Sequence, residues 1–371
     1  MTIDSEGWAL RPNGMHKLNR RTALAAMAGA GLGVPAAWAS GGTRALVGIF
    51  LTGGADTNNL IVPLDRTFTA YTRGRGALAL ARTSLLTVRT ANGRSFGFHP
   101  AARALKDLFE RRALAVVANV GGSTSPVKSG HRLEAVRFLR GGFLAPRLVQ
   151  AMGGVAFNTF RANGLSAAGP GGNAGAVTPD DPALLAAAQR VTLRTAFPPT
   201  GLGRQLELVA RLLAAGVGGQ VFCCNMGGFD THTRQLERET ALFTELSDAM
   251  AAFYEATVEF GAAGRVTAYT DTEFNRELTP NATLGTGHGW GGHHVVMGGS
   301  VAGGEVHGTF PDLAVGGAGD ATGKGVWIPS TLRERFESTL AAWSGIPLGD
   351  LFRLYPGLTG TASPTMPFLV G

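Results

Sequence analysis

The sequence predicts an α/β fold, with a largely parallel, doubly wound sheet flanked by helices. Two observations support this prediction. Apolar, strand-like runs alternate with stretches that have helical spacing, which is typical of parallel sheets with crossover helices. Several of these runs border turns rich in glycine, carboxylates and imidazoles, and such sheets bind ligands beyond their carboxyl ends. The length of 371 residues and the 44% hydrophobic content are sufficient for one large domain with a real core.

The first half of the chain supplies two expected strands with a helix between them. Residues 45–51 form an apolar, β-branched run that ends in a glycine-rich turn, and residues 114–120 form a second such run. Residues 101–111 have apolar positions at helical spacing, which predicts a short helix. Residues 161–181 are expected to be a plain loop, because their glycines lack the strand and the GK[ST] sequence of a phosphate-binding loop.

The second half continues the alternation of helices and strands. Two helices are expected within residues 184–215, broken near Pro198 and Pro199. A long amphipathic helix is expected over residues 233–260, where two rows with heptad spacing contain mostly apolar side chains. The remaining expected elements are strands over residues 265–270 and 294–297 and a last helix over residues 331–344.

The N-terminus has the features of an export signal. Arg20 and Arg21 form a twin-arginine pair, a short apolar run follows, and Ala37-Trp-Ala39 is a cleavage motif. We therefore expect residues 1–39 to be a Tat signal peptide and the protein to be periplasmic or secreted; the alternative is a loose N-terminal helix. Residues 40–371 are expected to form a single domain with a helical and loop insertion around residues 140–220. No other long apolar segment indicates a stable membrane anchor.

Composition excludes some classes of function. The formal net charge is +7, but no basic run interleaved with aromatic residues indicates nucleic-acid binding. Cys223 and Cys224 are adjacent within an apolar run. A disulfide between neighbours is strained, so we expect buried free thiols.

Metal-type side chains recur in the polar turns. Their positions are Asp56, Asp230, His232, Glu273 (or Asp271) and His288. Carboxylates and imidazoles that converge at one sheet edge could bind a divalent metal ion such as zinc, calcium or magnesium. His293 and His294 follow in the last turn; because a strand alternates its faces, one of them can face the site, and His293 is the nearer. Each residue alone could instead be a cap or a hydrogen-bonded structural residue.

Five motifs in combination resemble a known family. They occupy residues 53–59, 227–232, 272–276, 285–293 and 298–304. Together they resemble exported bacterial proteins of domain-of-unknown-function family 1501, which is grouped with the alkaline phosphatase/sulfatase superfamily. The resemblance covers roughly residues 44–345 and implies an alkaline phosphatase-like domain with a metal centre at the strand ends.

The resemblance also implies roles for individual residues. Asp56 would be the metal ligand of the first strand, Asp230 and His232 a second group, and Glu273 and His288 the remainder. Ser129 and His131 would lie in the nucleophile region, although Ser129 is equally well placed to be a helix N-cap. Further residues of the motifs are Asn59, Arg276 and His293.

The chain departs from the family pattern at two positions, so two alternative functions are open. Gly287 stands where the family usually has aspartate, and Gly130 separates Ser129 from His131. The first function is an exported metal-dependent hydrolase that acts on an anionic phosphate or sulfate ester. The alternative is a non-catalytic exported binding or assembly protein that retains the fold. The sequence indicates neither the substrate nor the oligomeric state.

Overall fold

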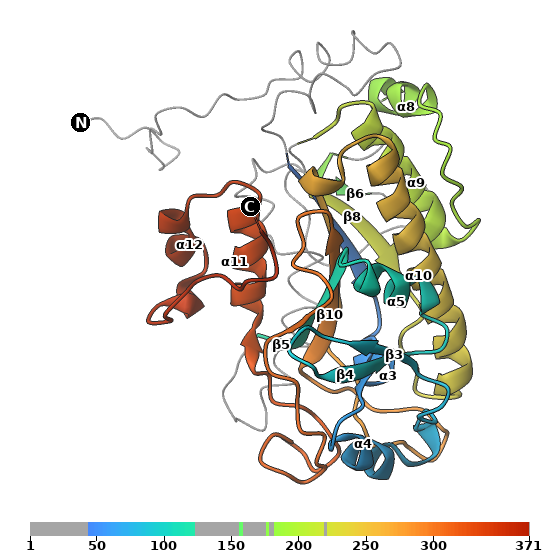
Figure 1. The fold of residues 1–371 in the computed structure, drawn as a ribbon, viewed down its shortest axis with the longest axis vertical. Helices are drawn as coiled ribbons and strands as arrows, with labels where there is room; N and C mark the ends of the chain where they lie inside the picture. Colours follow the sequence, from blue (N-terminus) through green and yellow to red (C-terminus); the bar gives the residue numbers. More distant parts are fainter. Residues whose placement is uncertain (1–43, 123–155, 159–175, 178–181, 219–220, 371) are drawn as a thin grey trace, which may run out of the picture.

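The computed structural model describes residues 44–122, 156–158, 176–177, 182–218 and 221–370 (Figure 1). The signal-peptide prediction for residues 1–39 concerns a segment outside the described residues. The same holds for Ser129 and His131.

A nine-stranded sheet forms the centre of the described structure, in the order β11-β5-β10-β9-β1-β8-β6-β7, with β12 also paired to β5. Every residue of β1 is buried, as expected for a strand covered on both faces. The strands are β1 (Ala45–Leu51), β5 (Leu114–Gly121), β6 (Ala156–Asn158), β7 (Ala176–Val177), β8 (Val221–Met226), β9 (Val266–Asp271), β10 (Gly292–Gly298), β11 (Val306–His307) and β12 (Thr331–Leu332).

The sheet is mixed, so the prediction of a largely parallel sheet holds in part: the pairings that do not involve β10 are parallel, and β10 is the exception. β1 runs parallel to β8 and β9, but β10 runs antiparallel to both β9 and β5. The cause is the connection over residues 272–291, which contains no helix. A parallel return needs a crossover segment, usually a helix, so this chain turns back beside the strand that it has just left. The amino end of β10 therefore lies at the edge where β1, β8 and β9 end.

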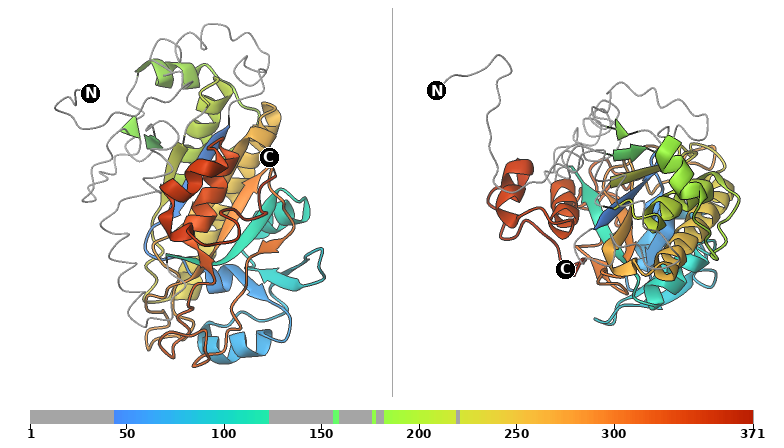
Figure 2. Two further views of the ribbon diagram at one scale, coloured as in Figure 1. Left: turned by 90° about the vertical axis from the view of Figure 1, so that its left-hand side faces the viewer. Right: turned by 90° about the horizontal axis from the view of Figure 1, so that it is seen from above.

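Helices cover both faces of the sheet, as predicted. Figure 2 shows α11 and α12 on one side and the layer of α9 and α10 on the other. The break before α9 is where the two prolines predicted it, and the Thr200 hydroxyl caps that helix by accepting from Gly203 N at 3.1 Å. The helices of these layers are α5 (Arg103–Glu110), α8 (Pro182–Gln189), α9 (Gly201–Ala214), α10 (Gln235–Glu259), α11 (Arg333–Trp343) and α12 (Leu348–Leu354).

A second, smaller sheet follows β1 and has no counterpart in the predicted elements. It is antiparallel, in the order β2-β4-β3. Its strands are β2 (Ile61–Pro63), β3 (Leu86–Arg89) and β4 (Ser95–Phe98), and the helices beside it in sequence are α3 (Thr57–Leu60) and α4 (Phe68–Arg75). Short 3-10 helices are η2 (Gly76–Leu78), η4 (Ala263–Arg265) and η5 (Pro356–Leu358).

Two further sequence expectations concern the cysteines and the membrane. Cys223 and Cys224 are both buried thiols that form no disulfide, as expected. Within the described ranges, no helix combines the length and the apolar character needed to cross a membrane.

Candidate metal centre

The loop after β8 presents Asp230 and His232 at the sheet edge. Phe229 is buried, and its backbone N–H donates to Thr52 O at 3.2 Å, which fixes the loop against the turn after β1. On the other side, the Arg238 guanidinium of α10 donates to Gly228 O at 2.8 Å and to Asp230 O at 3.0 Å. With its backbone held from both sides, the loop carries the two polar side chains outward.

His288 reaches the same place from the connection between β9 and β10. An isolated antiparallel bridge pairs it with Arg276. Its ring stacks on Phe274 with centroids 4.2 Å apart. Phe274 in turn lies over Gly54, where a Cβ would come within 2.0 Å of the phenyl ring. Gly54 also has a φ of +81°, so glycine is required there for two reasons.

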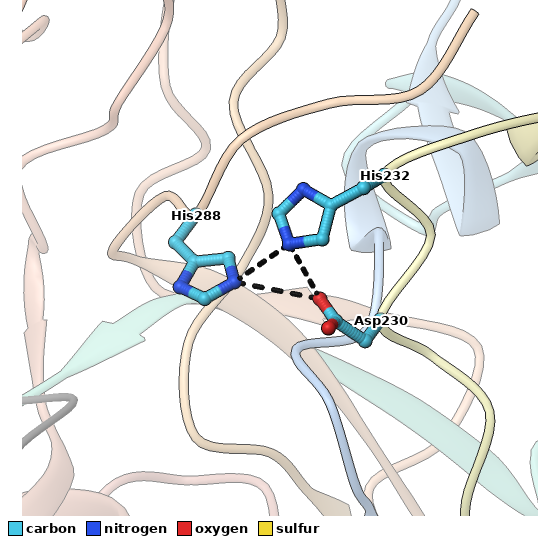
Figure 3. Close-up of side chains that lie close together, drawn as sticks. All are labelled: Asp230, His232 and His288. Atoms are coloured by element: carbon cyan, nitrogen blue, oxygen red, sulfur yellow. Dashed lines mark hydrogen bonds and ion pairs between the residues drawn. The ribbon is translucent and has the colours of Figure 1, made fainter. Parts of the chain in front are cut away.

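Three side-chain atoms converge in what we call the Asp-His-His group (Figure 3). His232 Nε2 lies 2.9 Å from Asp230 Oδ1, His288 Nε2 lies 3.4 Å from the same oxygen, and the two Nε2 atoms are 3.1 Å apart. The side chains remain about half exposed, at 57% for Asp230 and 47% for each histidine. The group is therefore accessible to solvent and to a ligand.

The donor atoms fit a divalent metal ion. An ion with bonds of ~2.0–2.1 Å to nitrogen and oxygen in tetrahedral geometry has ligand atoms about 3.3 Å apart, close to the three distances observed. Two imidazoles and one carboxylate with an exposed fourth side are typical of a catalytic rather than a structural site. Asp230, His232 and His288 form the only group of three histidine, cysteine or acidic side chains within the described ranges that is close enough together to hold an ion.

The charge states of Asp230 and His288 suit metal binding at neutral pH. Partial burial raises the pKa of Asp230, but the neighbouring His232 side chain, the Arg276 charge and hydrogen bonds to Arg276 and His288 outweigh it, and the pKa is lowered overall. Burial, followed by the Arg276 charge, lowers the pKa of His288, against the opposing effect of Asp230. Asp230 is thus a carboxylate and His288 a neutral imidazole, the forms that bind metal ions.

Arg276 is fully buried and joins the three loops that build the group. Its Nη1 donates to Gly53 O at 2.9 Å and to Asp230 Oδ1 at 3.2 Å. Its Nη2 donates to Thr286 O at 2.7 Å and lies 3.2 Å from His232 Nδ1. Nη2 also lies 3.5 Å from His232 Nε2, so it sits against the ring between both nitrogens, and the contact does not fix which nitrogen carries the ring proton.

The structure does not bring Asp56 into the Asp-His-His group. Asp56 is buried and caps α3, where its Oδ1 accepts from Asn58 N at 3.0 Å. Its Oδ2 forms an ion pair with Arg75 and accepts from Gln235 Nε2. Arg75 therefore balances the charge of the Asp56 carboxylate, which is bound at a place apart from the candidate metal ligands.

Asn59 belongs to the same buried cluster as Asp56. Its Oδ1 accepts from Tyr71 at 2.9 Å and from Arg75 Nε at 3.1 Å, and its Nδ2 donates to Glu239 Oε2 at 3.1 Å. Burial lowers the pKa of Arg75 to about 10, which leaves its guanidinium charged at neutral pH. The cluster thus places one guanidinium between the two buried carboxylates, Asp56 and Glu239.

Replacing Glu239 by glutamine is expected to change how stability depends on pH. Burial raises the pKa of Glu239 to about 7, against the opposing attraction of Arg75, from 4.5 for an unburied glutamate. The folded state therefore binds this proton more tightly, and the glutamate's contribution to the unfolding free energy falls as pH rises from about 4.5 to about 7. Between pH 5 and pH 8, wild type should lose on the order of 2 kcal/mol relative to Glu239→Gln.

Urea unfolding of both proteins at the two pH values measures this difference. Glu237→Gln changes an exposed glutamate of the same helix and should follow the wild type. Parallel pH profiles for wild type and Glu239→Gln would show that burial does not perturb Glu239.

The two acidic residues after β9 are also held apart from the group. Glu273 accepts from the backbone N–H groups of Gly53 and Gly54 at 3.0 Å, and burial raises its pKa. Asp271 forms an ion pair with Arg333, and its Oδ1 lies 3.7 Å from His294 Nε2. Glu273 therefore holds the turn after β1, while Asp271 tethers the start of α11.

His293 lies within β10 rather than in the Asp-His-His group. Its Nδ1 accepts from Asn119 N at 3.0 Å, and its ring stacks on Phe310 with centroids 4.1 Å apart. Burial, followed by the charge of His294, lowers the pKa of His293 to about 3. His293 is therefore a neutral, packed side chain.

The glycine at position 287 does not open a gap among the three candidate ligands. Glu277 N donates to Gly287 O at 3.0 Å, beside the bridge between Arg276 and His288. A Cβ built on Gly287 would lie 2.5 Å from Glu277 Oε2. Since neighbours in an extended pair alternate in direction, a side chain at 287 would meet Glu277 rather than the Asp-His-His group.

Sequence reasoning missed two buried polar residues next to the site, Gln235 and Thr286. Gln235 begins α10, and Thr286 stands within a glycine-rich block where glycine and histidine were the stronger signals. One available signal was Glu239, a charged residue in a heptad row that is otherwise apolar. An acidic side chain in the buried row of a helix indicates a polar partner in the core.

The comparisons with known proteins agree with the motif resemblance over part of the chain. Residues 186–322 match the family described as "Protein of unknown function (DUF1501)", which confirms the resemblance inferred from the motifs. No curated protein matches the chain by sequence.

Solved structures similar to this chain are distant in sequence. The lipoteichoic acid synthase LtaP from Listeria monocytogenes is 7% identical, with 84% of this chain and 81% of LtaP covered and a TM-score of 0.37. The C-terminal periplasmic domain of EcEptC from Escherichia coli, in complex with Zn, is 10% identical, with coverages of 69% and 73% and a TM-score of 0.34. Ps i-CgsB is 9% identical, with coverages of 87% and 77% and a TM-score of 0.38. All three TM-scores are below 0.5, and these likenesses assign no chemistry to the chain.

Proposed function

We propose that this DUF1501 protein is an exported, metal-dependent hydrolase of phosphate or sulfate esters. The observation that supports the proposal most directly is the Asp-His-His group. It offers two imidazole nitrogens and one carboxylate oxygen within 3.4 Å of one another on an exposed side of the sheet edge. A divalent metal ion bound there would supply electrophilic stabilisation of the negative charge that develops on an ester oxygen.

The protein's own residues prepare the site for an anionic substrate. Asp230 offers a carboxylate and His288 a neutral ring, while Arg276 places a fixed positive charge directly behind both loops. The five N–H groups of Arg276 all have partners within the protein. Arg276 therefore orients the candidate ligands and adds positive potential, and it does not donate to substrate.

The nucleophile and the route of export remain proposals from the sequence. Ser129 and His131 are the candidate nucleophile and its partner, and they lie outside the described residues. The twin-arginine pair and the cleavage motif before residue 40 support export of the folded protein to the periplasm or beyond.

The test measures metal content and turnover of the mature wild-type protein. After removal of bound metal with a chelator, Zn²⁺, Mn²⁺, Mg²⁺ and Ca²⁺ are titrated separately, and hydrolysis of p-nitrophenyl phosphate and p-nitrophenyl sulfate is followed. We expect one of these ions to bind and to restore hydrolysis of one of the esters. A protein that binds none of the ions would contradict the metal centre.

Metal binding without hydrolysis of either ester would favour the alternative function. In that case the protein would be a metal-containing binding or assembly protein that keeps the fold, and the hydrolase proposal would be wrong for these ester classes.

A further inference from the structure

A chain of four buried side chains connects Asp56 to the candidate metal centre. Gln235 Nε2 donates to Asp56 Oδ2. Gln235 Oε1 accepts from Thr286 Oγ1 at 2.7 Å. Thr286 Oγ1 accepts in turn from Arg276 Nε at 2.9 Å, and Asp56, Gln235, Thr286 and Arg276 are all less than 2% exposed.

The donors and acceptors of these four side chains allow only one direction for the hydrogen bonds between them. Asp56 is ion-paired and only accepts, so the amide of Gln235 must turn its NH₂ toward Asp56 and its oxygen toward Thr286. The Thr286 hydroxyl then donates its single proton to Gln235 Oε1. Its lone pair remains for Arg276 Nε, which can only donate. Each group thereby fixes the orientation of the next, from the carboxylate to the guanidinium.

The Nε–H bond matters because it determines how the guanidinium plane lies. With Nε held by the Thr286 side chain and Nη2 by the Thr286 backbone O at 2.7 Å, two nitrogens of the planar group are fixed to the same residue. The remaining N–H groups then reach Asp230 Oδ1 and His232 Nδ1, both at 3.2 Å. The orientation of two candidate ligands thus depends on a hydroxyl that contacts neither of them.

We propose that Thr286 and Gln235 are positioning residues of the metal centre, which act through Arg276 on Asp230 and His232. The inference rests on the proposed metal-binding function and places Asp56 at the far end of this row of hydrogen-bonded side chains. Outer partners of metal ligands commonly change affinity 10- to 100-fold when they are removed. Here the partner is two hydrogen bonds away from the ligands, so we expect the lower end of this range.

Thr286→Val and Thr286→Ser form the decisive pair of variants. Valine keeps the volume and removes the hydroxyl, while serine keeps the hydroxyl. Arg276 remains in both, so its charge is unchanged and only its placement differs. The matched control is Thr267→Val, because Thr267 is equally buried and its hydroxyl has no partner among the described residues.

The first measurement is the affinity for Co²⁺ and Zn²⁺, together with the visible absorption of bound Co²⁺. Thr286→Val should bind about tenfold more weakly and show an altered Co²⁺ spectrum, while Thr286→Ser and Thr267→Val should resemble wild type. Equal affinity and spectra for Thr286→Val and wild type would overturn the inference. Wild type that binds neither ion would instead contradict the proposed function.

A second measurement needs no metal. In the metal-free protein, the ¹⁵N shifts of the His232 ring report whether Arg276 still lies against the two ring nitrogens. We expect them to move in Thr286→Val and to stay in Thr286→Ser. Unchanged shifts in Thr286→Val would show that the chain does not orient Arg276, whatever the metal affinity is. Weaker metal binding without this change would assign Thr286 a purely structural role.

Discussion

Asp230→Asn is expected to abolish tight metal binding and, with it, metal-dependent ester hydrolysis. Asp230 is the carboxylate of the Asp-His-His group, and its Oδ1 is the atom that both histidines approach. Asparagine has nearly the same shape but removes the negative charge and leaves Arg276 facing a neutral amide. Since loss of an outer partner already costs 10- to 100-fold in affinity, we expect loss of this direct ligand to cost about 100-fold or more.

The matched control for this variant is Asp350→Asn. Asp350 is also an exposed aspartate beside an arginine, with Arg353 Nη2 at 3.0 Å, but it belongs to α12. Isothermal titration with Zn²⁺ should give wild-type affinity for Asp350→Asn and no measurable tight site for Asp230→Asn. A wild-type isotherm for Asp230→Asn would mean that the ion binds elsewhere.

Arg75→Met is expected to have the largest effect on stability. Arg75 is fully buried and forms an ion pair with Asp56, and its charge also attracts the buried Glu239. Methionine fills much of the space but leaves the Asp56 carboxylate in the core without its partner. Removal of one member of a buried ion pair typically costs about 3–5 kcal/mol, and we expect this loss in the free energy of unfolding by urea.

A surface pair and a double variant make this measurement specific. Arg94→Met breaks the partly exposed pair with Asp65, whose atoms are 3.5 Å apart, and should cost about 1 kcal/mol or less. Asp56→Asn combined with Arg75→Met should recover part of the lost stability, because the unpaired charge is removed as well. If Arg75→Met and Arg94→Met proved equally mild, the buried pair would not stabilise the fold.

The strands and helices around the core could be predicted because burial imposes simple patterns. β1 is apolar on both faces, so its run of seven residues matched the strand. The long helix α10 followed from the spacing of side chains such as Phe243, Leu246 and Phe253, which are all buried. Strand direction was harder, because β10 is apolar whichever way it runs. It depends on the path of residues 272–291, where pairing replaces the helix of a parallel crossover.

The candidate site was only partly accessible to sequence reasoning. Asp56 and Asp230 both follow strands in glycine-rich turns, and nothing local distinguishes them. What separates them is Arg75, on the short helix α4, in a region for which no element was predicted. Three- and four-residue strands such as β2 and β3 have too few residues to show a period. The partner that neutralises Asp56 therefore becomes visible only in three dimensions.

The central position of β1 has a consequence for synthesis of the chain. β1 leaves the ribosome before its neighbours in the sheet, β8 and β9, and about 170 residues separate β1 from β8. At about 5–20 residues per second, a strand whose residues all need burial waits about 10–30 s for its first partner. During that interval β1 is an apolar segment with unpaired backbone, the kind of segment that chaperones bind. A nascent chain truncated before residue 221 should therefore remain bound to holding chaperones, and one extended beyond residue 271 should be released.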